Sequence, residues 1–185
     1  TAGSGGYGGS DGGRGGGVVR IEASNRFTVN GSIYACGTSG GGTSVGSGAG
    51  GSIYITCNTF DGAYGKVRAR GGVASEAYSG NFHSGGGGRV AILFDKTEQA
   101  KGAVPPGMEY SADCGPFHGP GRNTFTQAEP GSLYFSSDTL IDRTGATLFG
   151  KLDFADVTTK WTIDSLRLTN GWAMFLREGV EMEVT

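Results

Sequence analysis

A short segment recurs along this chain with its parts in the same order. Each copy begins with a glycine and continues with apolar residues at every second position. The copies are GVVRIEA at residues 17–23, GSIYITC at 51–57, GRVAILF at 88–94 and GSLYFSS at 131–137. Repetition at this scale is typical of stacked, quasi-one-dimensional architectures. The sequence therefore points to a repeat scaffold before it points to any chemistry.

The alternation of apolar and polar residues in each copy is the pattern of a half-buried β-strand. A second module, GSIYACG at 31–37, returns as GKVRARG at 65–71 with the shift that carries Val19 onto Ile53. Superposing the copies predicts inward columns of equivalent residues, as a parallel β-solenoid buries them. The predicted columns are Val19, Ile53, Val90 and Leu133; Ile21, Ile55, Ile92 and Phe135; Ile33 over Val67; and Ala35 over Ala69. The expected fold class is all-β, a parallel β-solenoid.

Glycine supplies 38 of the 185 residues, against an ordinary share of about 7%. The glycines gather in blocks at residues 5–17, 37–51 and 85–88, without a sustained three-residue period, which excludes collagen. Because insertions in a solenoid map to loops on one face, these blocks predict long Gly-rich loops. Glycine would serve there by permitting tight turns with positive φ.

The whole chain, residues 1–185, is expected to form one β-helix domain and to be a processed or excised piece of a larger protein. A Gly-rich N-terminal segment covers residues 1–17, and residues 95–130, which hold all five prolines, form an elaborated loop. Tighter coils follow in residues 131–185. Their expected strands are 148–154, 161–168, 173–176 and 180–184.

Charge and hydropathy exclude several classes of partner. The net charge of −2 and the scattered arginines leave no basic footprint for nucleic acid. No apolar run approaches the roughly 18 residues that a membrane-spanning helix needs, so membrane insertion is not expected.

The phrases GGSIYITCNTF, GKVRARGG, SGGGGRVAILFD, PGSLYF and WTIDSLRLTNG resemble the Gly-rich β-helical repeats of very large secreted or cell-surface, adhesin-like proteins of bacteria and protists. The resemblance covers residues 17–94 well and 131–185 more loosely. It implies a right-handed parallel β-helix in an extracellular or cell-surface location. It carries over no catalytic residue, and residues 95–130 depart from the pattern, so a special function is most expected there.

The odd number of cysteines, three, allows one internal disulfide plus a free thiol, or a link between molecules. Strand alternation places Cys57 inward with Ile55, as a small core hydrophobe, and Cys36 outward with Tyr34. Direct pairing of Cys36 with Cys57 is therefore disfavoured, and Cys36 with Cys114 is the favoured pair if one forms.

The search for chemistry finds little, and no metal ligand set, cofactor motif or phosphate loop is expected. Both histidines, His83 and His118, lie in presumed loops without a nucleophile motif. Residues 8–13 lack the apolar position of a calcium-binding nonapeptide. Some parallel β-helices are polysaccharide lyases or hydrolases, which use carboxylates, lysine or arginine on an outward strand face. Here the candidates are Asp61, Lys66, Arg68 and Arg70, which serve equally as the polar exterior of a solenoid.

The outward column Arg20, Tyr54, Ala91, Tyr134 lacks the threonine array of an ice-binding surface. Exposed aromatic rings beside polar groups are instead typical of carbohydrate contacts, because the ring face stacks on sugar C–H bonds. The candidate glycan-contact residues are Tyr34, Tyr54, Tyr78 and Tyr134. Rings in Gly-rich segments could equally pin those segments down.

The expected function is a non-catalytic structural or adhesive element. It would self-associate into a filament or multimer, or continue into further repeats, with glycans as candidate ligands. The alternative is a polysaccharide-binding or polysaccharide-degrading β-helix. An unblunted solenoid end supports the first reading, since residues 181–185 still have strand character and residues 1–17 hold no amphipathic helix that could cover the other end.

Overall fold

The structure is a computed structural model that describes residues 1–8, 11–41, 45–74, 83–102, 107–115, 128–141, 147–163, 174–175 and 178–185. Over these residues the protein is mostly β, as predicted. The helical elements are the short helix α1 (Lys96–Ala100) and the 3-10 turn η2 (Asp138–Leu140). All paired strands in the described ranges are parallel.

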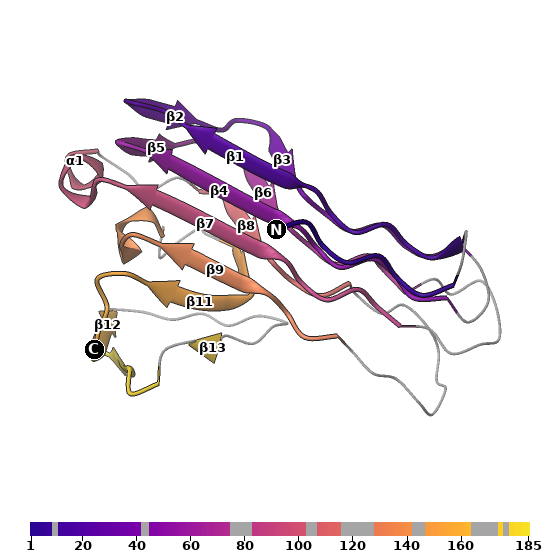
Figure 1. The fold of residues 1–185 in the computed structure, drawn as a ribbon. Coiled ribbons are helices and arrows are strands. Elements are labelled where there is room, and N and C mark those ends of the chain that lie inside the picture. The colour runs from indigo at the N-terminus through magenta and orange to yellow at the C-terminus, as the bar shows by residue number, and fades with distance from the viewer. Residues whose placement is uncertain are drawn as a thin grey trace.

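The largest sheet has six strands in the order β1-β4-β7-β9-β11-β13 (Figure 1). These strands are β1 (Val18–Glu22), β4 (Ser52–Cys57), β7 (Arg89–Phe94), β9 (Ser132–Phe135), β11 (Lys151–Phe154) and β13 (Met174–Phe175). A four-stranded sheet has the order β10-β8-β6-β3. Its strands are β10 (Thr147–Phe149), β8 (Glu109–Ser111), β6 (Lys66–Arg68) and β3 (Ser32–Tyr34). Two-stranded sheets join β2 (Arg26–Thr28) to β5 (Thr59–Asp61) and β12 (Lys160–Ile163) to β14 (Glu181–Val184).

The order in which the chain visits these sheets repeats. It passes through the six-stranded sheet at β1, the two-stranded sheet at β2 and the four-stranded sheet at β3, and then follows the same order through β4, β5 and β6. On the next round α1 stands between β7 and β8. Each round therefore lays its strands beside those of the round before, which is why all the pairings are parallel.

The predicted inward columns are confirmed. Ile21 pairs with Ile55, Ile55 with Ile92, and Ile92 with Phe135. Val19, Ile53, Val90 and Leu133 are paired in the same register. Successive members of each column therefore lie about 4.8 Å apart and bury one another's apolar surface.

Between the sheets, aromatic rings extend the core through several successive rounds of the chain. Neighbouring rings lie 5.1 to 6.3 Å apart between centroids, within the range of favourable aromatic pairs. The series is Phe27, Phe60, Tyr110, Phe135, Phe154 and Trp161. The Tyr110 hydroxyl, fully buried in this stack, has no hydrogen-bond partner among the described residues.

Two parts of the predicted layout differ in the structure. The loop assigned to residues 95–130 contains α1 and β8, and β8 joins the four-stranded sheet because Met108, Tyr110 and Ala112 alternate inward. The single strand expected over residues 148–154 is divided into β10 and β11, which belong to different sheets. Gly150 makes that corner with φ of +147°, a conformation that L side chains rarely adopt.

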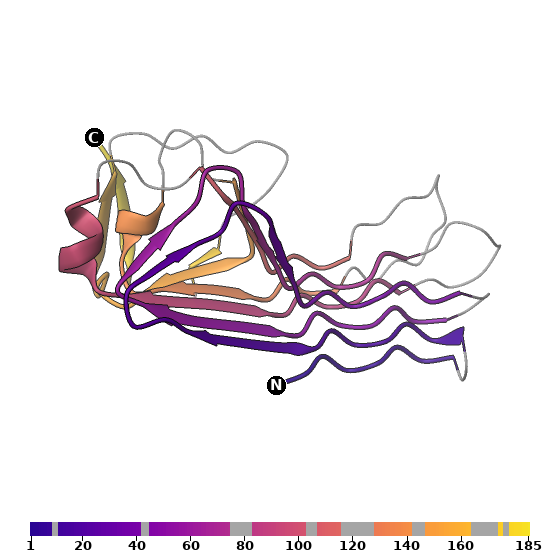
Figure 2. The same ribbon diagram turned by 90° about the horizontal axis from the view of Figure 1, so that it is seen from above.

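The Gly-rich segments form a second, elongated part of the molecule, which we call the glycine arm. It comprises residues 1–8, 11–17, 35–41, 45–51, 69–74, 83–88, 112–115 and 128–131. Figure 2 shows these segments running side by side away from the sheets as extended, undulating chains. Where described, they are thus packed against one another, which differs from the long loops that the sequence predicts.

Residues 45–51 show how the glycine arm is held together. Successive backbone N–H groups donate to three neighbouring segments in turn, and this order of three then repeats. The bonds, with N···O distances of 2.7 to 3.0 Å, run from Gly46 to Tyr7, Ser47 to His83, Gly48 to Thr38, Ala49 to Ser4, Gly50 to Gly86 and Gly51 to Ala35. A strand in a sheet alternates between neighbours with period two, whereas polyproline II has three residues per turn and no internal hydrogen bonds. The glycine arm is therefore a bundle with neighbours in three directions, not a sheet.

Close approach of backbones explains the glycines of the arm. A Cβ on Gly48 would lie 2.0 Å from the carbonyl oxygen of Arg14, and one on Gly85 would lie 1.9 Å from that of Gly48. Positive φ is not the reason, because the described glycines with positive φ are Gly8, Gly62, Gly150 and Gly179, of which only Gly8 belongs to the arm. Glycine is needed here because only a hydrogen atom fits between the chains, as at the axis of collagen.

Candidate functional site

The first candidate surface is an edge formed by residues 18–34, the first round of the chain through the three sheets; we call each such round a coil and these residues the first coil. Its strands β1, β2 and β3 each lie at the end of their sheets. An edge strand presents unpaired backbone groups that can pair with a further strand. Three sheets thus end on the same coil and on the same side (Figure 1).

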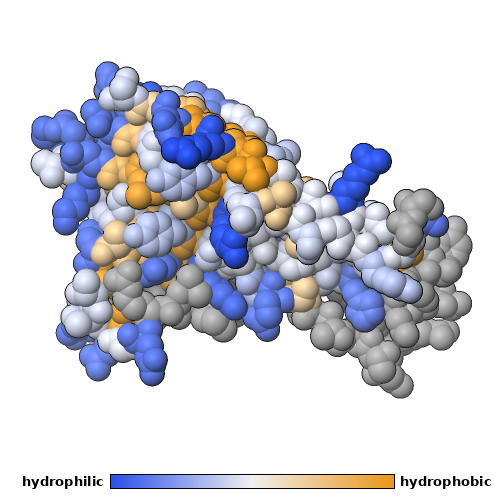
Figure 3. Space-filling view, viewed as in Figure 1, coloured by the Kyte–Doolittle hydropathy of each residue, from blue (hydrophilic) through white to orange (hydrophobic). Residues whose placement is uncertain are grey.

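Side chains of the first coil that point inward are incompletely covered. Val19, Ile21, Phe27 and Ile33 are half-buried and pack on the core from one side. Their partners in the next coil, Ile53, Ile55, Phe60 and Val67, are 0 to 1% exposed. Figure 3 shows hydrophobic surface along this edge, bordered by hydrophilic side chains. The difference in exposure between these two sets of side chains corresponds to the apolar surface that one further coil would bury.

The backbone of β1 identifies which groups face outward from this edge. The carbonyl of Gly17 and the N–H of Ala23 both bond to β4. Because alternate residues of a parallel ladder bond to the same neighbour, Val18, Arg20 and Glu22 direct their N–H and C=O groups to the open side.

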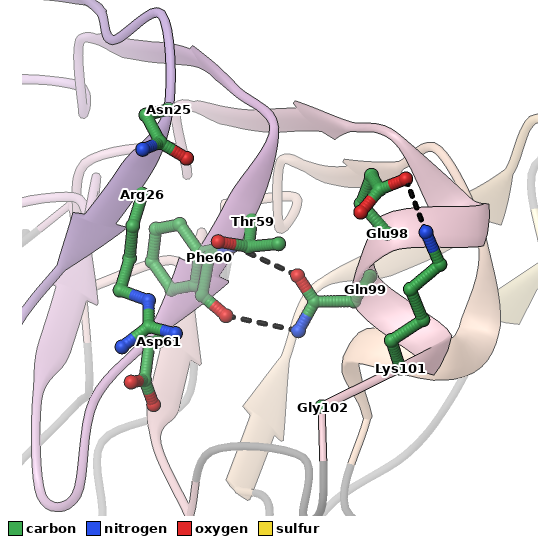
Figure 4. Close-up of a pocket in the computed structure, with 9 residues that line it drawn as sticks. All are labelled: Asn25, Arg26, Thr59, Phe60, Asp61, Glu98, Gln99, Lys101 and Gly102. Atoms are coloured by element: carbon green, nitrogen blue, oxygen red, sulfur yellow. Dashed lines mark hydrogen bonds and ion pairs between the residues drawn. The ribbon is translucent and has the colours of Figure 1, made fainter.

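The other side of the β2–β5 sheet is blocked. Helix α1 begins after Asp95, whose carboxylate accepts from the N–H groups of Thr97 and Glu98. The helix thereby holds Gln99 against β5 (Figure 4). Its side-chain oxygen accepts from the Phe60 N–H at 2.8 Å, and its side-chain nitrogen donates to the Phe60 carbonyl at 2.9 Å. One amide side chain therefore satisfies the backbone groups that another strand would use.

A groove of about 600 Å³ lies between this helix and the β2–β5 sheet (Figure 4). It is lined by Asn25, Arg26, Thr59, Phe60, Asp61, Glu98, Gln99, Lys101 and Gly102. Several polar side chains of the groove already have partners within the protein, since Gln99 forms hydrogen bonds with β5 and Lys101 pairs with Glu98 at 2.6 Å. Both carboxylates of the groove already have partners as well, since Glu98 is the partner of Lys101 and Asp61 accepts from the Gly62 N–H at 2.7 Å.

The second candidate surface is the outward face of the six-stranded sheet. One row across it reads Arg20, Tyr54, Ala91, Tyr134 and Asp153 from β1 to β11. The Arg20 guanidinium carbon lies 5.8 Å from the centroid of the Tyr54 ring, within cation–π range. Two of the candidate glycan-contact residues, Tyr54 and Tyr134, therefore lie in one row with Ala91 between them.

The neighbouring row on this face borders a hollow of about 310 Å³. Ser52, Arg89, Ser132 and Lys151 line it and are aligned strand by strand. Arg89 donates from Nη1 to the Thr1 hydroxyl at 3.0 Å, and Lys151 lies 3.4 Å from a Glu129 carboxylate oxygen. The hollow thus combines hydroxyl groups with two cations beside the tyrosines.

The other candidate glycan contacts lie elsewhere. Tyr34 is 52% exposed on β3, with the Arg68 guanidinium carbon 5.7 Å from its ring centroid, and it belongs to the four-stranded sheet. Tyr78 lies outside the described residues, as does His118. His83 is exposed in the glycine arm, and its carbonyl accepts from the Ser47 N–H.

Of the charged residues considered for an enzyme, Asp61 lies on a different sheet from Lys66 and Arg68. Asp61 is on β5, and its carboxylate accepts from the Gly62 N–H at 2.7 Å, whereas Lys66 and Arg68 are on β6. Arg68 donates twice to the Glu109 carboxylate at 2.5 Å, and this hydrogen bonding raises the pKa of Arg68. Arg70 lies 3.9 Å from Asp113. Arg68 therefore holds neighbouring coils together, which is a structural use of its charge.

No disulfide joins Cys36, Cys57 or Cys114 in this structure, so the Cys36–Cys114 pair stays a prediction. The Cys36 thiol points to the Arg68 carbonyl at 3.4 Å, and that of Cys114 contacts the Asp113 carboxylate at 3.6 Å. Cys57 is buried in the core beside Phe94, as predicted. Burial raises the pKa of the Cys57 thiol to about 11, which makes it a poor nucleophile at neutral pH.

Sequence reasoning missed Gln99, Arg89 and Lys151 as members of these surfaces. Arg89 follows directly from the repeat register, because it aligns with Ser52 and Ser132, whereas Lys151 lies outside the repeated copies and is placed beside Ser132 only by the structure. Gln99 had no such signal, since its role depends on how α1 folds back on β5.

Among the described residues, no group of His, Cys, Asp and Glu side chains could hold a metal ion. The same residues include no helix with the length and apolarity to cross a membrane. Comparison of the chain with protein-family models, with curated proteins and with solved structures finds no match in any of the three. The two surfaces described above are therefore the basis for assigning a function.

Proposed function

We propose that this protein is a non-catalytic structural or adhesive element of a secreted or cell-surface protein. Its coils belong to a right-handed parallel β-helix of the Gly-rich repeat type. The first coil accepts a further coil of the same kind, supplied by adjacent repeats or by another copy. The observation that carries this proposal is that β1, β2 and β3 are all edge strands of their sheets.

The chemistry of the open edge supports a coil as its occupant. Val19 and Ile21 are the first members of two inward columns, and the members that follow them are branched apolar residues paired in register. A strand of the same pattern would therefore satisfy the outward backbone groups and cover the half-buried side chains together. The Gln99 contact provides a contrast, because there a side chain occupies the edge of β5.

The polysaccharide-degrading alternative draws less support from the site. Asp61 lies on a different sheet from Lys66 and Arg68, and Arg68 is held by Glu109. Glycoside hydrolysis requires paired carboxylates that flank one bond. The α1 groove is lined by two carboxylates, but Glu98 pairs with Lys101 and Asp61 accepts from the Gly62 N–H, and no carboxylate is among the residues that line the hollow beside the tyrosines.

Sedimentation velocity over a range of protein concentrations tests the stacking. We expect concentration-dependent association, with electron microscopy showing open-ended particles if the first coil meets the β13 and β10 end of another copy. Pairing of two first coils would instead give a closed dimer. A strictly monomeric particle at all concentrations would contradict self-association.

A matched pair of variants places the contact on β1. Arg20→Pro removes an N–H that points to the open side, so a lone chain tolerates it while edge pairing is blocked. Arg20→Ala removes the same side chain and keeps that N–H. We expect Arg20→Pro to remain monomeric and Arg20→Ala to associate. Equal association of the two variants would place the contact elsewhere.

A further inference from the structure

On the outward face of the six-stranded sheet, Tyr54 and Tyr134 belong to one row, which we call the tyrosine row. Between these two large side chains the row has only the small side chain of Ala91. Arg20 covers the Tyr54 ring from the β1 side. On the β7 side the next member is Ala91, whose methyl group cannot reach the height of the rings, and Tyr134 follows on β9. Tyr54 and Tyr134 are two strand positions apart, which is about 9.6 Å. We call the gap that the register leaves above Ala91, between the positions of Tyr54 and Tyr134, the slot.

The width of this slot selects the shape of its occupant. Neighbouring strands lie about 4.8 Å apart, so a group bound above Ala91 has one strand spacing between its centre and the tyrosine position on each side. A pyranose ring, which is puckered and thicker than an aromatic ring, fills that space and presents C–H groups to both tyrosines. The slot thus fits a single sugar ring held between two aromatic faces.

The charges beside the slot select among sugars. Arg89 lies two residues before Ala91 on β7 and points to the same face, and Lys151 lies in the same row two strands away. Both border the polar hollow, together with the hydroxyls of Ser52 and Ser132. Arginine binds carboxylates through paired hydrogen bonds. An acidic substituent on the sugar would therefore lie over the hollow while the ring occupies the slot.

We propose that the outward face of the six-stranded sheet binds an acidic saccharide, with one uronic acid ring between Tyr54 and Tyr134 over Ala91 and its carboxylate toward Arg89. This binding goes beyond coil stacking and does not rest on it. It occurs on the face of the sheet, whereas stacking uses the edge of the first coil, so either one can fail alone.

Calorimetric titration with trigalacturonate, and with cellotriose as the neutral counterpart, tests this site. We expect binding of trigalacturonate that weakens about tenfold or more in Tyr54→Ala and in Tyr134→Ala, since each loses a stacking face. Arg89→Gln should reduce the preference for the acidic sugar. Absence of binding to both sugars, or equal affinity of the unmodified protein for the two, would overturn the proposal.

The decisive variant is Ala91→Tyr, which fills the slot. It completes the aromatic row, so the melting temperature should be kept or raised while trigalacturonate binding is lost. Tyr34→Ala, on the four-stranded sheet, is the matched control and should bind as the unmodified protein does. Retained binding in a folded Ala91→Tyr variant, or an equal loss in Tyr34→Ala, would place the sugar elsewhere. Should Ala91→Tyr not fold, Ala91→Leu fills the floor of the slot and carries the same expectation.

Discussion

The sheets and the glycine arm use the same repeats to reach order by opposite means. In the sheets, side chains such as Ile55 and Ile92 fill the space between strands and are fully buried. In the arm, side chains are largely absent, and backbone hydrogen bonds in three directions connect chains that approach too closely for a Cβ. The first region is stabilised mainly by removal of apolar surface from water and the second by backbone bonding and close contact.

This comparison shows that a high glycine content does not by itself indicate loops. Glycine loses more backbone freedom on folding than other residues, which opposes order in an isolated Gly-rich chain. The arm offsets this loss because each coil adds segments beside those already in place. A repeat scaffold can thus order chain that could not order alone.

The largest effect is expected from a charge in the sheet core. Ile55→Asp places a carboxylate between Ile21 and Ile92 and should lower the free energy of unfolding by about 4 kcal/mol or more. Tyr54→Asp, the adjacent outward position, should cost far less. Thermal denaturation of both variants measures the difference. Equal losses would remove the distinction between inward and outward positions.

The glycine arm should be almost as sensitive at its contact positions. A Cβ at Gly85 would lie 1.9 Å from the Gly48 carbonyl oxygen, whereas one at Gly86 has its nearest atom at 3.6 Å. We expect Gly85→Ala to cost about 3 kcal/mol and Gly86→Ala to be neutral or slightly stabilising. Denaturation gives the energies, and amide exchange over residues 46–51 reports whether the arm loosens. Similar behaviour of the two variants would show that the arm is not close-packed.

Alkaline pH should reveal the core through Cys57. Its pKa rises from an ordinary 9.0 to about 11, so the folded state favours the neutral thiol. The corresponding stability is present below pH 9 and is lost as the pH rises from 9 to 11. The free energy of unfolding, measured across this pH range, should fall more steeply for the unmodified protein than for Cys57→Ala. Parallel curves would mean that the thiol is accessible to water.

The smallest expected effect is a gain in stability from a substitution at Tyr110. The buried hydroxyl of Tyr110 lacks a hydrogen-bond partner among the described residues, and burial raises its pKa. Tyr110→Phe keeps the ring stack and removes that polar atom, so we expect stabilisation by about 1 kcal/mol in chemical denaturation. A loss of stability would indicate that the hydroxyl is satisfied in solution.

The candidate site could be predicted only in part. Tyr54 and Tyr134 were found from exposed positions in the repeats, and the register already placed Ala91 between them. Tyr34 follows the same alternation, but its strand belongs to another sheet, so it does not join the row. Asp61 likewise lies on a different sheet from Lys66 and Arg68, since a strand pattern gives the face of a residue and not the sheet to which that face belongs.

By itself, the sequence determined the strands of the repeated copies, their parallel register and the inward columns, because a period of two and the same order of residues in each copy favour one alignment of the alternating apolar positions. The tertiary structure decided the rest. The three-residue bonding of the arm, the corner at Gly150 and the Gln99 contact with β5 all depend on which backbones lie side by side. A glycine shows in the sequence only that no side chain is present, and whether that space admits a turn or a neighbouring chain is settled when the coils stack.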